Sequence, residues 1–278
     1  MGRLAPSGAL AVPLAALAAA LLAATPAAAM DRFEIQVYDA EIDDPGQPSL
    51  EAHLNVTPRG LRAPEYPGAL PPDRLGRLTL EPAIGVTPWL ELGAYLQGVA
   101  GPGGLYRYGG FKLRAKLVVP EATRQALGLP VFLGLNAEVA HLPHELEEAP
   151  WTMELRPIVG WRGERWLVSF NPIVGWALTG HDALRPDLDP CGKVAWDTRR
   201  GVAVGLEYYA GLGAAAGAFS PGRAREQLLL AVLDLAPAAP PGEPAAESPW
   251  ELDLGAGLGL TAATGQHLVV KAIVGRSF

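Results

Sequence analysis

The stretch FKLRAKLVV at residues 111–119 places three cations on alternate positions of an otherwise apolar run. The cations are Lys112, Arg114 and Lys116, and the residues between and beside them are Phe111, Leu113, Ala115 and Leu117. A helix would scatter the cations around its circumference, whereas a strand, with its period of two, places all three on one face. The stretch therefore predicts a β-strand that is apolar on one side and strongly charged on the other.

The same alternation recurs almost to the end of the chain. One face is steadily Leu, Val, Ala and Trp, and the other carries one or two charges among Gly, Ala and Asn. The segments are 50–57, 78–84, 89–99, 131–139, 151–161, 166–178, 202–210, 250–260 and 268–278. Most are close to the roughly 9 to 11 residues that cross a bilayer as a tilted strand. A soluble sandwich also alternates, but its outward face is polar and varied. The repetition predicts an all-β fold, an antiparallel transmembrane β-barrel.

Connections of two kinds separate these segments. Short or middling ones are 85–88, 120–129, 162–165, 198–201 and 237–248, and mostly longer ones are 58–77, 100–107, 142–150, 179–190, 212–225 and 261–267. This alternation is typical of periplasmic turns and extracellular loops. From residue 78 it gives five hairpins and a final strand, and 50–57 adds the first strand. We therefore predict about twelve strands over residues 50–278.

The N-terminus precedes the barrel. Residues 1–29 have one cation, an Ala/Leu core and an A-x-A arrangement before Met30, which predicts a cleaved signal peptide. An uncleaved membrane anchor is the alternative. The segment FEIQVYDA (33–40) also alternates and would make a thirteenth strand. We therefore assign residues 30–49 to an extension of the first strand, on the periplasmic side or tucked inward.

Charge and hydropathy restrict the class of protein. Removal of the signal peptide would change the formal net charge from −7 to −8, which argues against a nucleic-acid partner. After residue 30 no apolar run approaches the roughly 18 residues of a membrane helix, which excludes a helical membrane protein. The single cysteine, Cys191, cannot form an internal disulfide. We expect a location in the outer membrane of a Gram-negative bacterium, reached by secretion through the inner membrane, with outer-membrane lipid and the barrel assembly machinery as partners.

The chain ends on Phe278, on the same strand face as Val274 and Val270. A terminal aromatic residue on an alternating strand resembles the signal that outer-membrane barrels present to their assembly machinery, although Arg276 departs from that pattern. All seven tryptophans fall near predicted strand ends, as expected of membrane interfaces. They are Trp89, Trp151, Trp161, Trp166, Trp176, Trp196 and Trp250.

The polar faces of the predicted strands would meet in the lumen. Charges in a narrow barrel are costly unless paired, so the three cations facing several glutamates predict a cross-lumen network of ion pairs. Such pairs either fill and rigidify the interior or line a path for an anionic solute. The predicted lumen and solute-path residues are Lys112, Arg114, Lys116, Glu51, His53, Glu81, Glu91, Tyr95, Glu138, Glu154, Arg156 and Glu207.

Catalytic and metal motifs are sparse. His53 could in principle join Ser169 and Asn171, the residue types that twelve-stranded outer-membrane phospholipases use, but the local motif of those enzymes is not found here. A Ser-His-Asn set acts only within hydrogen-bond reach. The stretch HLPHE (141–145) does not supply a third strong metal ligand, and the acidic loop 39–44 lacks EF-hand spacing. We predict no catalytic residue, no metal site, no cofactor and no enzymatic activity.

Three stretches carry a resemblance to a known group. They are FEIQVYDAEIDDPGQPSLEAHLN, LTLEPAIGVTPWLELGAYLQ and VAVGLEYYAGLG. Together they resemble uncharacterised exported proteins of proteobacteria, which are in turn similar to outer-membrane barrels assigned as transporters in gene clusters for aromatic (phenol meta-pathway) degradation. The resemblance spans nearly the whole mature chain and implies a barrel.

The sequence thus favours a channel or transporter for small solutes, anionic or aromatic ones among them, with a charged lumen. A closed structural barrel with an ion-paired lumen and an outer-membrane lipid hydrolase are the two alternatives.

Overall fold

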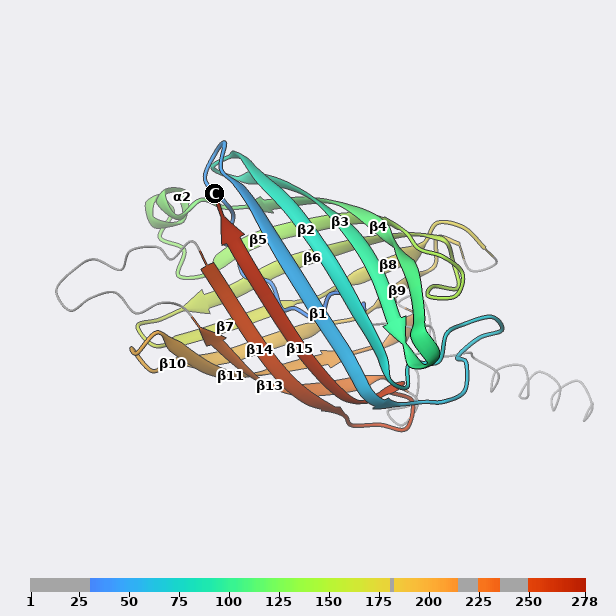
Figure 1. The fold of residues 1–278 in the computed structure, drawn as a ribbon. Coiled ribbons are helices and arrows are strands. Elements are labelled where there is room, and N and C mark those ends of the chain that lie inside the picture. Colours follow the sequence, from blue (N-terminus) through green and yellow to red (C-terminus); the bar gives the residue numbers. More distant parts are fainter. Residues whose placement is uncertain (1–30, 181–182, 215–224, 236–249) are drawn as a thin grey trace, which may run out of the picture.

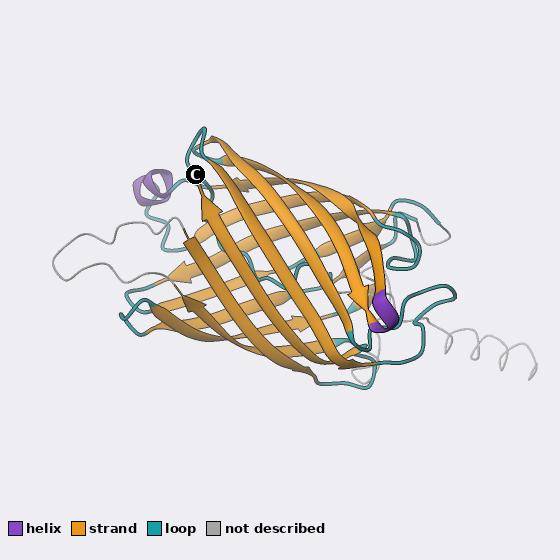
Figure 2. Ribbon diagram, viewed as in Figure 1, coloured by secondary structure: helices purple, strands orange, loops and turns teal. Residues whose placement is uncertain are grey.

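A computed structural model describes residues 31–180, 183–214, 225–235 and 250–278. The predicted signal peptide and the connection 237–248 lie outside the described residues. Strands dominate these described ranges, which also contain one short helix, α2 (Glu121–Ala126), and one 3-10 turn, η1 (Pro102–Gly104) (Figure 2). Across the described ranges, no helix has the length and apolar character needed to cross a membrane.

The strand elements follow one another around a single sheet (Figure 1). They are β1 (Pro48–Gly60), β2 (Leu75–Thr87), β3 (Leu90–Gly101), β4 (Leu105–Val118), β5 (Phe132–His141), β6 (Trp151–Arg162), β7 (Trp166–Asn171), β8 (Val174–Ala177), β9 (Pro186–Leu188), β10 (Cys191–Asp197), β11 (Val202–Ala210), β12 (Gly213–Ala214), β13 (Gln227–Leu235), β14 (Trp250–Gly259) and β15 (Gln266–Ser277).

The sheet is a closed antiparallel barrel of twelve strands. It closes where β1 pairs with β15, with Asn55 opposite Lys271. Three of the twelve strands are each divided into two elements, β7 with β8, β9 with β10 and β11 with β12. Pro172 and Pro190 lie at two of these breaks, where the missing amide hydrogen cannot serve the ladder. The predicted strand count and antiparallel order are confirmed.

The described connections alternate between the two ends of the barrel, and the turn end has most of the shorter ones. The turn end carries the connections 88–89, 119–131, 163–165 and 198–201, together with the start of β1 and the C-terminus. The loop end carries 61–74, 102–104, 142–150 and 260–265. In Figure 1 the C-terminus lies beside the start of β1. There Phe278 donates its backbone N–H to the carbonyl oxygen of Pro48 at 2.9 Å.

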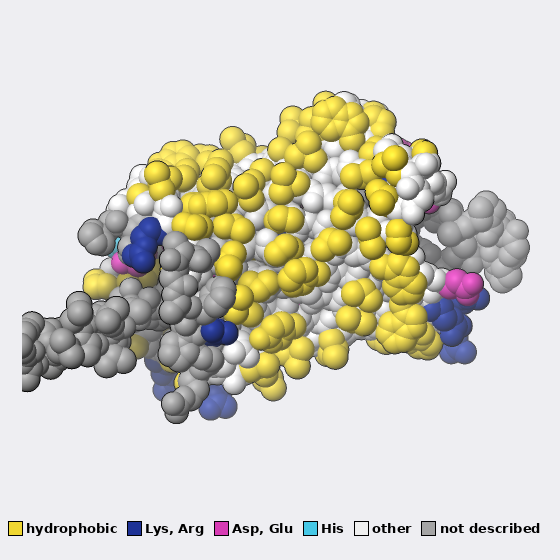
Figure 3. Space-filling model, turned by 180° about the vertical axis from the view of Figure 1, so that it is seen from behind, with side chains coloured by type: hydrophobic (Ala, Val, Ile, Leu, Met, Phe, Trp, Pro, Cys, Tyr) yellow, Lys and Arg dark blue, Asp and Glu magenta, His cyan; other side chains and the backbone are white. Residues whose placement is uncertain are grey.

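The outer face of the barrel is apolar and the inner face is polar or tightly packed. On β4 the Leu113 side chain is 59% exposed, whereas Arg114 is only 7% exposed. Figure 3 shows hydrophobic side chains covering the strand wall, with charged side chains gathered toward the two ends. Trp89, Trp151, Trp161, Trp166 and Trp250 are all exposed. A soluble barrel would place such a continuous apolar surface in water, so this surface fits lipid.

Residues 31–47, here called the luminal segment, run through the barrel from the loop end to the turn end. Near the loop end Arg32 pairs with Glu65, and near the turn end Asp43 accepts a hydrogen bond from Ser277. Among the residues that the structure describes, the segment joins the barrel ladder through one isolated bridge, between Pro45 and Gly85. Residues 31–47 of the 30–49 extension predicted from the sequence therefore lie inside the barrel, and β1 begins at Pro48, two residues before the predicted boundary.

Alternation within the luminal segment matches two different walls of the lumen. Ile35 and Val37 pack into an apolar cluster with residues of β10, β11, β13 and β15. Phe33 packs into a second cluster that includes Leu75 of β2 and Val99 of β3. On the opposite parity, Glu34 interacts with the charged side chains of β4 and β6. The segment therefore directs its apolar side chains toward apolar clusters of the wall and Glu34 toward the cations of β4 and β6.

Candidate functional site

The charged wall is built around the three cations of β4. The ammonium of Lys112 lies 2.9 Å from a carboxylate oxygen of Glu138 on β5 and 3.5 Å from one of Glu34, and it also pairs with Asp31. Lys112 is 5% exposed. The cation thus joins the barrel wall to the luminal segment through three carboxylates, which compensates the cost of burying its charge.

Arg114 bridges two strands on the other side of β4. Its Nη2 lies 2.7 Å from Glu81 of β2 and 2.8 Å from Glu91 of β3. Glu91 in turn accepts the backbone N–H of Asp43 at 2.7 Å, which ties the turn end of the luminal segment to the wall. The guanidinium lies across Gly93, where a Cβ atom would come within 2.8 Å of its Nε.

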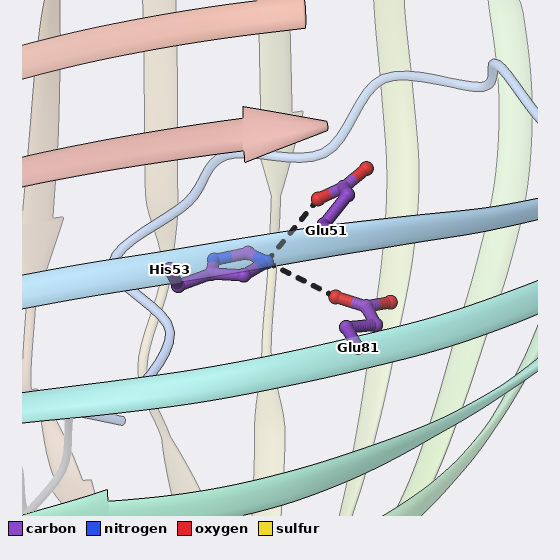
Figure 4. Close-up of side chains that lie close together, drawn as sticks. All are labelled: Glu51, His53 and Glu81. Atoms are coloured by element: carbon purple, nitrogen blue, oxygen red, sulfur yellow. Dashed lines mark hydrogen bonds and ion pairs between the residues drawn. The ribbon is translucent and has the colours of Figure 1, made fainter. Parts of the chain in front are cut away.

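His53 lies between two carboxylates at the centre of this wall (Figure 4). Its Nε2 is 3.2 Å from an oxygen of Glu51 on the same strand and 3.1 Å from one of Glu81 on β2. The ligand atoms of these three residues lie within 4.8 Å of one another, as do those of Asp31, Glu34 and Glu138. In both groups a neighbouring cation, Arg114 or Lys112, already binds a carboxylate. We therefore assign both as ion-pair clusters.

The ring of Tyr38, in the luminal segment, makes cation–π contacts with several cations of the wall. The guanidinium carbon of Arg156 lies 4.5 Å from its ring centroid and the ammonium of Lys116 lies 4.8 Å from it. Lys116 makes no ion pair within 4.0 Å among the described residues. The Tyr38 hydroxyl lies 2.8 Å from that of Tyr95 on β3. Cation–π contacts of this kind hold the segment against the charged wall.

Arg156 of β6 completes the predicted set on this wall. Its Nε donates to Glu154 at 2.8 Å and its Nη1 donates to the carbonyl oxygen of Gln36 at 3.2 Å. The pairs of the charged wall join neighbouring strands and the luminal segment. The cross-lumen pairing expected from the sequence is therefore replaced by contacts to a segment that fills the space between the walls.

A second charged cluster lies on the strands opposite, and only Glu207 of it was among the predicted site residues. Glu207 pairs with Lys271 of β15 at 2.7 Å and with Lys193 of β10 at 3.4 Å. Asp253 of β14 contacts both lysines, at 3.5 and 3.4 Å. The signal that could have found this cluster was parity, because Lys271 occupies the same strand face as other inward residues of β15.

Wall side chains bind the backbone of the luminal segment along its length. Asn55 donates to the carbonyl oxygen of Phe33 at 2.8 Å, and Lys271 donates to that of Ile35 at 3.0 Å. Asn171 both accepts the Tyr38 backbone N–H at 2.7 Å and donates to the Tyr38 carbonyl oxygen at 3.0 Å. These contacts replace the ladder that a strand in the sheet would have.

The luminal segment leaves little free space beside it. A cavity of about 20 Å³ remains between the segment and the wall, lined by Glu34, Arg156 and Asp189 among others. That is room for about one water molecule. A much larger cavity, of about 660 Å³, opens at the loop end.

The residues considered for catalysis and metal binding have other contacts. The Ser169 hydroxyl donates to the Tyr38 carbonyl oxygen, and the His53 Nε2 faces carboxylates. His141 stacks between Phe111 and Trp151, at 5.8 and 4.7 Å between ring centroids. His144 contacts the carbonyl oxygens of Pro67 and Glu148. Each of these side chains therefore packs against its neighbours or forms polar contacts within the protein, and Ser169 binds the luminal segment.

The terminal residue Phe278 is 63% exposed at the turn end. The guanidinium of Arg276, the residue that departs from the assembly pattern, lies 4.9 Å from the Trp250 ring and 5.0 Å from the Phe278 ring. Its charge is therefore placed among interface aromatics rather than in the apolar band.

Comparison with solved structures finds the same barrel fold in outer-membrane proteins. The COG4313 outer-membrane channel from Pseudomonas putida F1 superposes with a TM-score of 0.53 and 16% sequence identity, covering 88% of this chain and 100% of that one. The KdgM porin gives a TM-score of 0.50 at 8% identity, covering 83% and 99%. The fold is shared with outer-membrane channels. No protein-family model matches the sequence, and no curated protein matches it significantly.

Proposed function

We propose that the protein is an outer-membrane channel for small solutes, closed in the observed state by its luminal segment. The observation that carries this proposal is the separation of side chains across the wall, with apolar ones outward and ionised ones inward around a segment that is not part of the sheet. Because the described part of the sheet meets that segment in one isolated bridge, a movement of the segment would leave the ladder that closes the barrel intact.

Unpaired polar groups in the lumen support a hydrated path. Gln97 is 3% exposed, and both polar atoms of its side-chain amide lack a hydrogen-bond partner among the described residues. The Nη1 of Arg77 also lacks a hydrogen-bond partner among the described residues, and Arg77 is 4% exposed. Buried polar groups are costly unless they are hydrogen-bonded, and water is their usual partner when the protein supplies none. Water bound at such groups would make the lumen better suited to conduction than a purely structural interior is.

The closed structural barrel is the second candidate, and the tight filling of the lumen favours it. Single-channel recording in planar bilayers separates the two. The chain beginning at Met30 is compared with a variant that lacks residues 31–44. We expect little or no conductance from the first and clear conductance from the second, because the deletion empties the lumen. A deleted barrel that folds, as judged by heat-modifiable migration on a detergent gel, but does not conduct would support the structural role.

Ion preference tests whether the charged wall lines the path. In the deletion background, Lys112→Glu and Arg114→Glu should shift the preference toward cations, since charges in the lumen tune selectivity. The matched control is Arg124→Glu, on α2 outside the barrel. An unchanged reversal potential in both lumen variants would contradict a path along β4.

A further inference from the structure

The large cavity at the loop end lies where β1 ends and β2 begins. It has a volume of about 660 Å³, within the range of sites that hold small organic ligands. The loop 61–74 and the residues around η1 complete its lining. We call it the arginine pocket, after Arg59, Arg62 and Arg74, which line it.

The arginine pocket carries more positive than negative charge. Arg62 and Arg74 approach the same oxygen of Asp73, at 3.7 and 3.2 Å, and their side chains are 88% and 65% exposed. Arg59 makes no ion pair among the described residues. The backbone N–H of Gly60, helped by Arg74 and Arg62, holds the pKa of Asp73 below its usual value, so this carboxylate stays ionised. Three guanidinium groups against one carboxylate leave a surplus of two positive charges.

The floor of the arginine pocket is apolar. It includes Leu70, Leu75 and Leu105, which also pack against the cluster that holds Phe33 of the luminal segment. A ligand in the pocket would therefore rest on side chains that contact the segment closing the barrel. An inorganic anion would bind the arginines but leave the leucine floor in contact with water. A neutral hydrocarbon would cover the floor but leave the arginines without a ligand.

We infer that the arginine pocket binds small organic anions with an apolar body, such as aromatic carboxylates, at the mouth of the barrel. Guanidinium groups bind carboxylates through paired, charge-assisted hydrogen bonds, and the leucine floor accepts the ring. The inference rests on the proposed function insofar as it names the class of solute, but binding itself does not require conduction.

Equilibrium dialysis of radiolabelled benzoate against the purified full chain in detergent tests the inference. We expect saturable binding that Arg59→Gln and Arg62→Gln each weaken by roughly five- to tenfold, the loss of about one charge-assisted hydrogen bond. Leu70→Ser should also weaken it. Arg107→Gln is the matched control, because Arg107 is an exposed arginine at the same end that does not line the pocket. Equal affinities in all four variants and the wild type would overturn the inference.

Competing ligands test the two halves of the site separately. Benzamide, which has the ring without the charge, and inorganic phosphate, which has charge without the ring, should each compete poorly with benzoate. Effective competition by either one contradicts an organic-anion site. A barrel that binds benzoate through these arginines but never conducts would retain this inference and refute the proposed function. A barrel that conducts while the arginine variants bind benzoate normally would retain the proposed function and refute this inference.

Discussion

The ammonium of Lys271 on β15 donates a hydrogen bond to the carbonyl oxygen of Ile35 at 3.0 Å, deep inside the barrel. Lys271 is 1% exposed and Ile35 is fully buried. The same ammonium pairs with Glu207, so one cation serves the wall and the luminal segment together. This link ties the luminal segment to the Lys271–Glu207 ion pair of the wall.

The substitution Lys271→Met should loosen the luminal segment and destabilise the barrel. Methionine fills a similar volume but leaves Glu207 with a weaker set of partners and the Ile35 carbonyl oxygen without this donor. Removing one partner of a buried ion pair costs on the order of 3 to 5 kcal/mol. We expect a lower unfolding midpoint in detergent and faster proteolysis within residues 31–47.

A second substitution in the same pair serves as the control. Adding Glu207→Gln to Lys271→Met removes the carboxylate charge that has lost its nearest cation, so the double variant should recover part of the lost stability. Proteolysis of the luminal segment should remain fast, since the bond to Ile35 is still missing. A double variant no more stable than Lys271→Met alone would contradict this pairing.

Alternation in the sequence was sufficient to predict the barrel, because a strand shows on its two faces which solvent each one meets. The stretch 111–119 fixes this directly: its cations are buried and Leu113 faces outward. Strand boundaries were less predictable. The segment 166–178, expected to be one continuous strand, is divided between β7 and β8. Pro172, which ends the ladder there, was visible, but its effect on pairing depends on neighbours that only the fold supplies.

The site was only partly predictable. Parity alone showed that Glu81, Glu91 and Arg114 point inward, but which cation meets which carboxylate depends on strand register. The role of residues 31–47 was less accessible still, because an alternating segment reads the same whether its two faces meet lipid and lumen or two walls of one lumen. Glu34 and Tyr38, central to the observed contacts, therefore were not among the predicted residues.

Gly93 provides a test of the Arg114 bridge. A Cβ atom at this position would lie 2.8 Å from the Arg114 Nε, so Gly93→Ala should displace the guanidinium from Glu81 and Glu91. Overpacking of this kind costs about 1 to 3 kcal/mol. Gly98→Ala on the same strand is the control, because its nearest neighbour would be 3.6 Å away. Unfolding midpoints in detergent should fall for the first variant only; equal midpoints would mean that Arg114 shifts without loss.

A charge on the outer face tests the membrane assignment. Leu113→Arg places a cation in the apolar band, where it should cost about 2 to 4 kcal/mol if the residue lies near the bilayer midplane. Leu127→Arg, at an exposed residue directly after α2, should cost little. We expect the first variant to fold less completely into lipid vesicles than the second. Equal folding yields in vesicles, with Leu113→Arg also stable in aqueous buffer, would indicate a soluble barrel.

The terminal aromatic residue is expected to act during assembly rather than in the folded barrel. Phe278 is largely exposed, and its hydrogen bond to Pro48 uses the backbone, so Phe278→Ala removes few native contacts. We therefore predict an unchanged unfolding midpoint in detergent but a several-fold lower yield of heat-modifiable barrel in the outer membrane of an expressing cell. Arg276→Leu is the comparison, because it brings the terminus closer to the usual apolar pattern and should maintain or raise that yield. If Phe278→Ala assembled as well as the wild type, the residue would be an interface aromatic without a role as a signal.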